Sequence, residues 1–184
     1  MSQNKGLPGI DRIAEVFDFL DDWEQRYEFL IELGAKLPPF PAADQLDSNR
    51  VMGCMSKVWI VVQPDAGQPD RLRFHGDSDT STVKGLVALL VALYSGRSAE
   101  EVLATDADAF FDRLGLFDHL SPTRHVGVYA MVEKVRALAE SQAGHAGGDG
   151  CMHAAGGRPG AGGVASPGCL RRIRISPFGR ISGA

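Results

Sequence analysis

The sequence predicts an α+β fold, in which a small antiparallel sheet made by one hairpin is covered by several helices. Two observations support this class. Most of the first 140 residues carry apolar side chains at the 3.6-residue period of amphipathic helices. Between residues 58 and 75 the pattern changes to a β-branched run, a turn-forming stretch at 65–69 and a strictly alternating segment, which together are typical of a β-hairpin.

Two helices are expected before the hairpin. Asp11 is placed to cap the first, and Asp21 or Asp22 to cap the second. Gly34, followed by two prolines, is expected to end the second helix. The apolar positions that follow the helical period are Ile13, Val16, Phe17 and Leu20 in the first helix, and Trp23, Tyr27, Leu30, Ile31 and Leu33 in the second.

The hairpin itself is expected at 58–63 and 71–75, with His75 on a solvent-exposed face. Residues 76–81 are rich in side-chain oxygens and are expected to cap the next helix. That helix, at 83–93, is apolar nearly all round and is therefore expected at the centre of the fold. Three further helix starts are indicated by Ser98 with Glu101 as a capping box, by Thr105 or Asp106, and by Ser121-Pro122; the last helix is expected to reach about Glu140.

Composition limits the classes of function. The chain has 184 residues, 44% hydrophobic and 23% charged, which suits one soluble globular domain. It shows neither a secretory leader nor an apolar run long enough to span a bilayer, so a cytoplasmic protein without membrane contact is expected. Up to Glu140 there are 14 Lys and Arg against 22 Asp and Glu, an acidic balance that argues against a nucleic-acid partner.

The sequence divides into a flexible N-terminus at 1–9, a domain at 10–140 and a disordered tail at 141–184. The tail holds 12 of the 22 glycines, with Ala, Pro and Arg and no apolar period. It carries His145, Cys151, His153 and Cys169, but their spacing matches no standard zinc site, so no metal is expected. The tail is read either as a lineage-specific linker or as the product of a shifted reading frame.

Cys54 is the candidate functional residue, because it is the only cysteine before the tail and follows Gly53 where a polar loop enters an apolar strand. A thiol on the lip of a loop can be partly covered and still be reached by a partner, which suits a nucleophile. The alternative is a free cysteine that acts as a small hydrophobic residue.

Four groups of residues resemble the SufE family of sulfur acceptors. They are Arg26-Tyr27 with 30–34 and Leu37-Pro38; Gly53-Cys54-Met55-Ser56-Lys57-Val58-Trp59; Gly76-Asp77-Ser78-Asp79 with Val83-Lys84-Gly85-Leu86; and His119-Leu120-Ser121-Pro122-Thr123-Arg124 with Gly127. They cover roughly residues 10 to 140, and four motifs in one order are far more specific than a lone Gly-Cys pair. The resemblance implies a fold like that of SufE and of the IscU-type cluster scaffolds.

The resemblance also implies a function. Cys54 would accept sulfur as a persulfide from a pyridoxal-phosphate (PLP) cysteine desulfurase, SufS-like or CsdA-like, and pass it to an iron-sulfur scaffold such as a SufB-like complex. The chain would activate that enzyme without being an enzyme itself and would bind no cofactor of its own. Gly53 would remove bulk beside the sulfur and permit unusual backbone angles, so that the loop could swing out for a partner.

Three other residues have two interpretations each. Arg124 either favours the Cys54 thiolate, or it faces solvent or pairs with an acid such as Asp118. Asp79 is expected chiefly as a helix cap, with a part in positioning the loop as the alternative. Lys84 is expected to be solvated or ion-paired, and His119 to pack or cap the turn before the last helix.

Other functions are less well supported. A cysteine hydrolase needs an oriented histidine, and none of the five histidines has a recognisable motif around it. A cluster-holding protein needs several soft ligands, and the body has one cysteine. The remaining alternative is a partner that stimulates a desulfurase allosterically without carrying sulfur, and the motifs do not separate the SUF branch from the CsdE branch.

Overall fold

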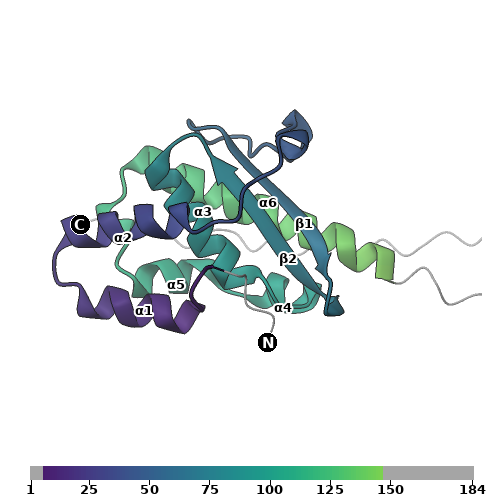
Figure 1. Ribbon diagram of the computed structural model, residues 1–184, viewed down its shortest axis with the longest axis horizontal. Coiled ribbons are helices and arrows are strands. Elements are labelled where there is room, and N and C mark those ends of the chain that lie inside the picture. The colour runs from purple at the N-terminus through teal and green to yellow at the C-terminus, as the bar shows by residue number, and fades with distance from the viewer. Residues whose placement is uncertain (1–5, 147–184) are drawn as a thin grey trace, which may run out of the picture. The chain divides into compact units, whose positions relative to one another are not determined.

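The computed structural model describes residues 6–146, which form helices around a two-stranded antiparallel sheet, so the predicted α+β class is confirmed (Figure 1). In chain order the helices and strands are α1 (Ile10–Phe19), α2 (Trp23–Ala35), β1 (Val58–Asp65), β2 (Gln68–Ser78), α3 (Ser81–Tyr94), α4 (Ala99–Ala104), α5 (Ala107–Arg113) and α6 (Pro122–Ala146). Short 3-10 turns lie at Ala42–Asp44, Asp47–Asn49 and Phe117–His119.

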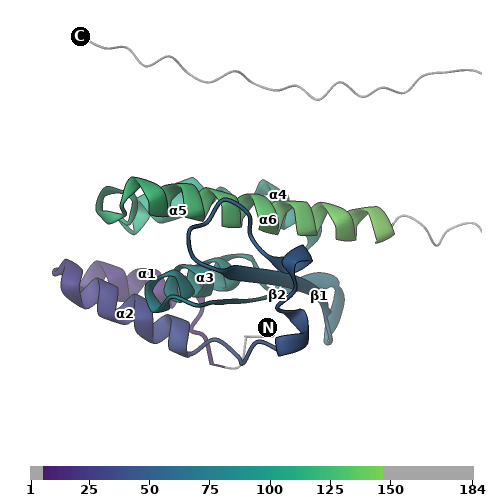
Figure 2. The same cartoon turned by 90° about the horizontal axis from the view of Figure 1, so that it is seen from above.

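Helix α3 lies at the centre, as its apolar sequence predicts. Figure 2 shows α3 with α1 and α2 on one side and α4, α5 and α6 on the other, and the hairpin beside α3. Helices α2 and α3 cross closely, because Gly34 and Gly85 meet at the crossing. A Cβ on Gly85 would lie 2.3 Å from the carbonyl oxygen of Leu30, so only glycine fits there. Gly34 is therefore a packing residue, and α2 continues through it to Ala35.

The strands are longer than predicted. The register pairs Val58 with Ser78 and Ile60 with Gly76, so residues 76–78 complete β2 instead of capping α3. Gly76 hides the alternating pattern, and a Cβ there would lie 2.6 Å from Val87. The exposed position expected for His75 is wrong, because its side chain is half-buried. Burial, together with the nearby Arg73 charge, lowers the pKa of His75 from 6.5.

The helix starts agree with the sequence in most cases. The Asp22 carboxylate accepts a hydrogen bond from the Glu24 N–H at 3.3 Å, and Asp106 accepts one from Ala109 at 3.1 Å. The expected Asp11 cap is wrong: α1 begins at Ile10, and Gly9 stands at its cap position without a side-chain bond. Leu7, in the segment expected to be flexible, is only 5% exposed and belongs to the core.

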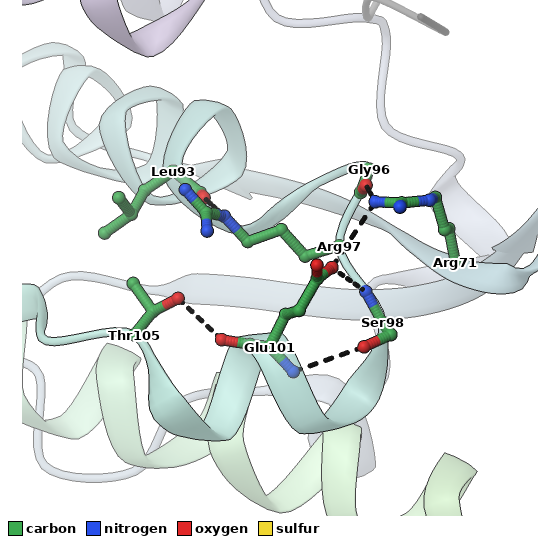
Figure 3. A network of polar contacts seen from close by, with 7 residues as sticks. All are labelled: Arg71, Leu93, Gly96, Arg97, Ser98, Glu101 and Thr105. Carbon is green, nitrogen blue, oxygen red and sulfur yellow. Dashed lines mark hydrogen bonds and ion pairs between the residues drawn. The ribbon is translucent and has the colours of Figure 1, made fainter.

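The predicted capping box on α4 is confirmed and extends into a wider network (Figure 3). Arg71 on β2 donates to the Gly96 carbonyl at 2.6 Å and to the Glu101 carboxylate at 3.3 Å. The Leu72 N–H donates to the Arg97 carbonyl at 2.8 Å, so the turn between α3 and α4 pairs with the edge of β2. This pairing fixes one end of the sheet to the helices.

Helix α6 begins at Pro122, as predicted, and continues to Ala146, beyond the expected end near Glu140. The rest of the expected tail, with Cys151, His153 and Cys169, lies outside the described residues, as does the side chain of His145. Within residues 6–146, no helix has the length and apolar character needed to cross a membrane.

Candidate functional site

Cys54 lies on a narrow loop at residues 52–57 that leads into β1. The Val51 N–H donates to the Val58 carbonyl at 2.9 Å and closes the loop, and Arg50 forms an isolated bridge with Trp59 just outside it. The Cys54 side chain is half-buried, whereas the methionines on either side of it, Met52 and Met55, are 77% and 85% exposed. The loop therefore presents an exposed tip and turns its thiol inward.

The second half of the loop is anchored to the junction of β2 and α3 by Asp79. Its Oδ1 accepts hydrogen bonds from the Lys57 N–H and from the Thr80 hydroxyl, both at 3.1 Å, and its own N–H donates to the Lys57 carbonyl at 3.2 Å. The Ser56 and Thr80 hydroxyls are 3.0 Å apart. Thr80 occupies the cap position of α3. The expectation that Asp79 caps this helix is therefore wrong, and its hydrogen bonds instead join it to the Cys54 loop.

A pocket of about 280 Å³ opens beside the thiol. Cys54 forms one wall of it, and the first turns of α6 form another through Arg124, Gly127 and Met131. The remaining lining residues are Met55, Ser56, Thr80, Val83, Leu86, Ser121 and Thr123. The fold thus brings Cys54 and Arg124, which are far apart in the sequence, to the same cavity.

Arg124 is exposed, and among residues 6–146 its guanidinium makes no ion pair or side-chain hydrogen bond. Of the two alternatives expected for it, the solvent-exposed position is observed, and the pair with Asp118 does not form. An unpaired guanidinium that lines the same cavity as a thiol provides positive charge near the place where a thiolate or persulfide anion develops.

Two glycines flank the thiol for different reasons. Gly53 has φ +93°, a backbone angle that favours glycine, while a Cβ there would meet only Ala130 at 3.6 Å. The unusual backbone angle expected at Gly53 is confirmed. Gly127 lies directly under the thiol, where a Cβ would be 3.1 Å from the Cys54 Sγ. Sequence reasoning treated Gly127 only as part of a motif and missed this contact, and it also missed Thr80.

The turn before α6, and with it Arg124, is held against α2. The His119 ring stacks on Trp23 with a centroid distance of 3.6 Å, and the Tyr27 hydroxyl donates to the His119 carbonyl. The packing role expected for His119 is confirmed. Lys84 forms the expected ion pair, with Asp77 at 2.7 Å.

The site offers the chemistry of one thiol. In the described part of the chain, no three His, Cys, Asp or Glu side chains come together as candidate metal ligands. What remains is a half-buried nucleophile, a cationic group that lines the same cavity and a cavity larger than a single sulfur atom needs.

Comparisons with known proteins identify the relatives of this chain. The SufE family model, described as an Fe-S metabolism associated domain, matches residues 11–139. An uncharacterized SufE-like protein of Rhizobium etli is 42% identical over 139 residues, covering 74% of this chain and 93% of that protein. A second one, from Rhizobium meliloti, is 39% identical over 137 residues, covering 74% and 98%.

A solved structure shows the same fold. The solution structure of a hypothetical protein from Thermus thermophilus matches with a TM-score of 0.60 and 26% identity, over 73% of this chain and 96% of that one. The family model spans well over half of this chain, and both relatives exceed 30% identity. This chain therefore belongs to the SufE family, whose domain is associated with Fe-S metabolism.

Proposed function

We propose that this protein is the sulfur acceptor and activator of a PLP-dependent cysteine desulfurase, SufS-like or CsdA-like, in the cytoplasm. It carries the sulfur as a persulfide on Cys54 to an iron-sulfur scaffold such as a SufB-like complex. Membership of the SufE family supports the general role. The observation that carries the proposal is the half-buried Cys54 thiol, which lines a cavity of about 280 Å³ on a loop with an exposed tip.

The transfer is a thiol exchange. The Cys54 thiolate attacks the outer sulfur of the desulfurase persulfide; a new S–S bond forms on Cys54, and the desulfurase cysteine leaves as a thiolate. The electrons balance without an external oxidant or reductant. PLP acts earlier, on the partner enzyme, and the exchange itself needs no cofactor on this chain. Arg124 stabilises the anionic sulfur before and after the exchange.

The loop surroundings suit a transient protein partner. Met52 and Met55 project from the tip, and Val126, next to Gly127 on α6, is 58% exposed. Exposed methionines adapt to partner surfaces because their side chains are flexible and polarizable. Docking on this surface brings a partner cysteine to the mouth of the cavity that holds Cys54.

Intact-mass analysis tests the carrier role directly. After incubation with a desulfurase and cysteine, we expect the chain to gain one sulfur that peptide mapping places on Cys54. The double variant Cys151→Ser with Cys169→Ser is the matched control, because it retains only Cys54 and should gain the same mass. A sulfur mapped to either tail cysteine, with none on Cys54, would contradict the proposal.

The competing function is a non-carrying partner that stimulates the desulfurase allosterically. Cys54→Ser distinguishes the two, because it keeps the loop and removes the sulfur nucleophile. We expect this variant to bind the desulfurase and to lose the stimulation of its turnover. Stimulation equal to that of the parent protein would favour the allosteric alternative.

A further inference from the structure

Gly127 has a feature that neither helix formation nor backbone geometry explains. It lies within the first turns of α6, where glycine disfavours the helix more than any residue except proline. Its φ angle is not in the left-handed region that requires glycine. Gly127 is nevertheless buried, so something packed against it must account for the missing side chain.

The packed group is Cys54 alone. A Cβ on Gly127 would lie 3.1 Å from the Cys54 Sγ and 3.9 Å from its Cβ. Apart from the two neighbouring residues and the adjoining backbone of α6, no other atom of the described chain lies within 4 Å of that position. Attractive contacts between heavy atoms have their optimum at about 3.5–4.0 Å, so an alanine at 127 would force the sulfur outward by several tenths of an ångström.

The direction in which the sulfur would move follows from the loop. Lys57 is hydrogen-bonded to Asp79, whereas the tip residues Met52 and Met55 are exposed to solvent. An added Cβ on Gly53 would make only an ordinary contact with α6, at 3.6 Å from Ala130. The tip is therefore the part of the loop that yields when Cys54 is pushed away from α6.

We propose that Gly127 is a positioning residue that provides the seat for the Cys54 sulfur. The bare backbone of α6 lets the thiol rest against the helix, half-buried at the wall of the cavity. If the proposed function holds, the same seat keeps a persulfide on Cys54 covered between donor and recipient. A side chain at position 127 shifts the loop toward a conformation in which the Cys54 sulfur is more exposed to solvent and to reagents.

Alkylation of the free thiol by iodoacetamide tests the seat, and it requires no desulfurase. Gly127→Ala should raise the alkylation rate of Cys54 about fivefold or more. Overpacking a buried contact usually destabilises the packed state enough to increase the population of the open state by at least that factor. An increase in access should raise the rate by the same factor at every pH. Gly144→Ala is the matched control, because Gly144 lies on the same helix and an added Cβ there meets nothing within 4 Å. Its alkylation rate should equal that of the parent.

A double-mutant cycle by urea unfolding keeps the proposal testable even if Gly127→Ala folds poorly. In a Cys54→Ala background the sulfur is absent, so Gly127→Ala should stabilise the protein as Gly144→Ala does. In the parent protein, which has the Cys54 sulfur, Gly127→Ala should not give this increase in the free energy of unfolding. An unchanged or slower alkylation rate for folded Gly127→Ala, or an equal effect of Gly127→Ala on unfolding in both backgrounds, would overturn the proposal. Because neither assay uses a desulfurase, failure of sulfur transfer would count against the proposed function alone.

Discussion

Replacing Asp79 by alanine should loosen the Cys54 loop without unfolding the protein. The change removes the acceptor of the Lys57 N–H and Thr80 hydroxyl hydrogen bonds, both 3.1 Å long. The bond from the Asp79 N–H to the Lys57 carbonyl and the Val51 to Val58 closure remain, because both use backbone atoms. The second half of the loop therefore loses its side-chain anchor and keeps its backbone register.

The magnitude follows from the exposure of the anchor. Hydrogen bonds to charged groups contribute about 1.5–3 kcal/mol when they are shielded, but the Asp79 carboxylate is exposed to solvent. Solvent screening reduces the contribution to about 1 kcal/mol, which corresponds to an increase of about fivefold in the population of the open loop. Asp79→Asn keeps an acceptor oxygen and should show a smaller increase.

Amide hydrogen exchange at Lys57 is the direct measurement, and alkylation of Cys54 is the functional one. Asp106→Ala is the matched control, since it removes an exposed carboxylate that accepts the Ala109 N–H at the same 3.1 Å, on a helix away from the loop. It should lower overall stability and leave the loop unchanged. The reasoning is refuted if Lys57 stays as protected in Asp79→Ala as in the parent, or if Asp106→Ala speeds its exchange equally.

Three further predictions concern stability. Gly85→Ala should lower the free energy of unfolding by about 3 kcal/mol, because its Cβ would lie 2.3 Å from the Leu30 carbonyl oxygen. A urea unfolding midpoint equal to that of the parent would contradict this prediction. Tyr94→Phe should be neutral or stabilising by up to about 1 kcal/mol, since the buried hydroxyl has no hydrogen-bond partner within residues 6–146; a clear drop in Tm would count against this. The hydrogen bond from Arg73 lowers the pKa of Asp65 below its ordinary value of 3.8. The ionised Asp65 carboxylate therefore stabilises the fold above the ordinary pKa, and this stabilisation is lost as the pH falls through the lowered pKa of the folded protein. Asp65→Asn should therefore show a weaker dependence of the unfolding midpoint on acid pH than the parent.

Local sequence patterns were enough to predict the α+β class, the hairpin and several helix starts. The capping box of Ser98 and Glu101 and the Asp22 and Asp106 caps were predictable because each bond joins residues two or three positions apart. Cys54 stood out for a related reason, since a glycine and a thiol between a polar loop and an apolar strand form a contiguous signal. Its four supporting motifs indicated the family without any structure.

The corrections share a different cause, which is packing between distant segments. The sequence around Asp79 looks like a helix cap, yet its carboxylate bonds to Lys57, 22 residues away. Gly76 looks like the end of a strand, yet the strand continues because its bare backbone fits against Val87. His75 alternates like an exposed residue and is half-buried in the folded chain.

The sequence by itself determined which residue carries the chemistry, because a thiol is a property of one side chain. Only the tertiary structure decided how that thiol is held: it rests against Gly127, lines a cavity that Arg124 also lines, and sits on a loop anchored through Asp79. These contacts join segments that are far apart along the chain, and they exist only once α3, α6 and the hairpin have packed. Patterns over a few residues report local hydrogen bonds and burial, whereas the surroundings of Cys54 depend on how whole elements pack together.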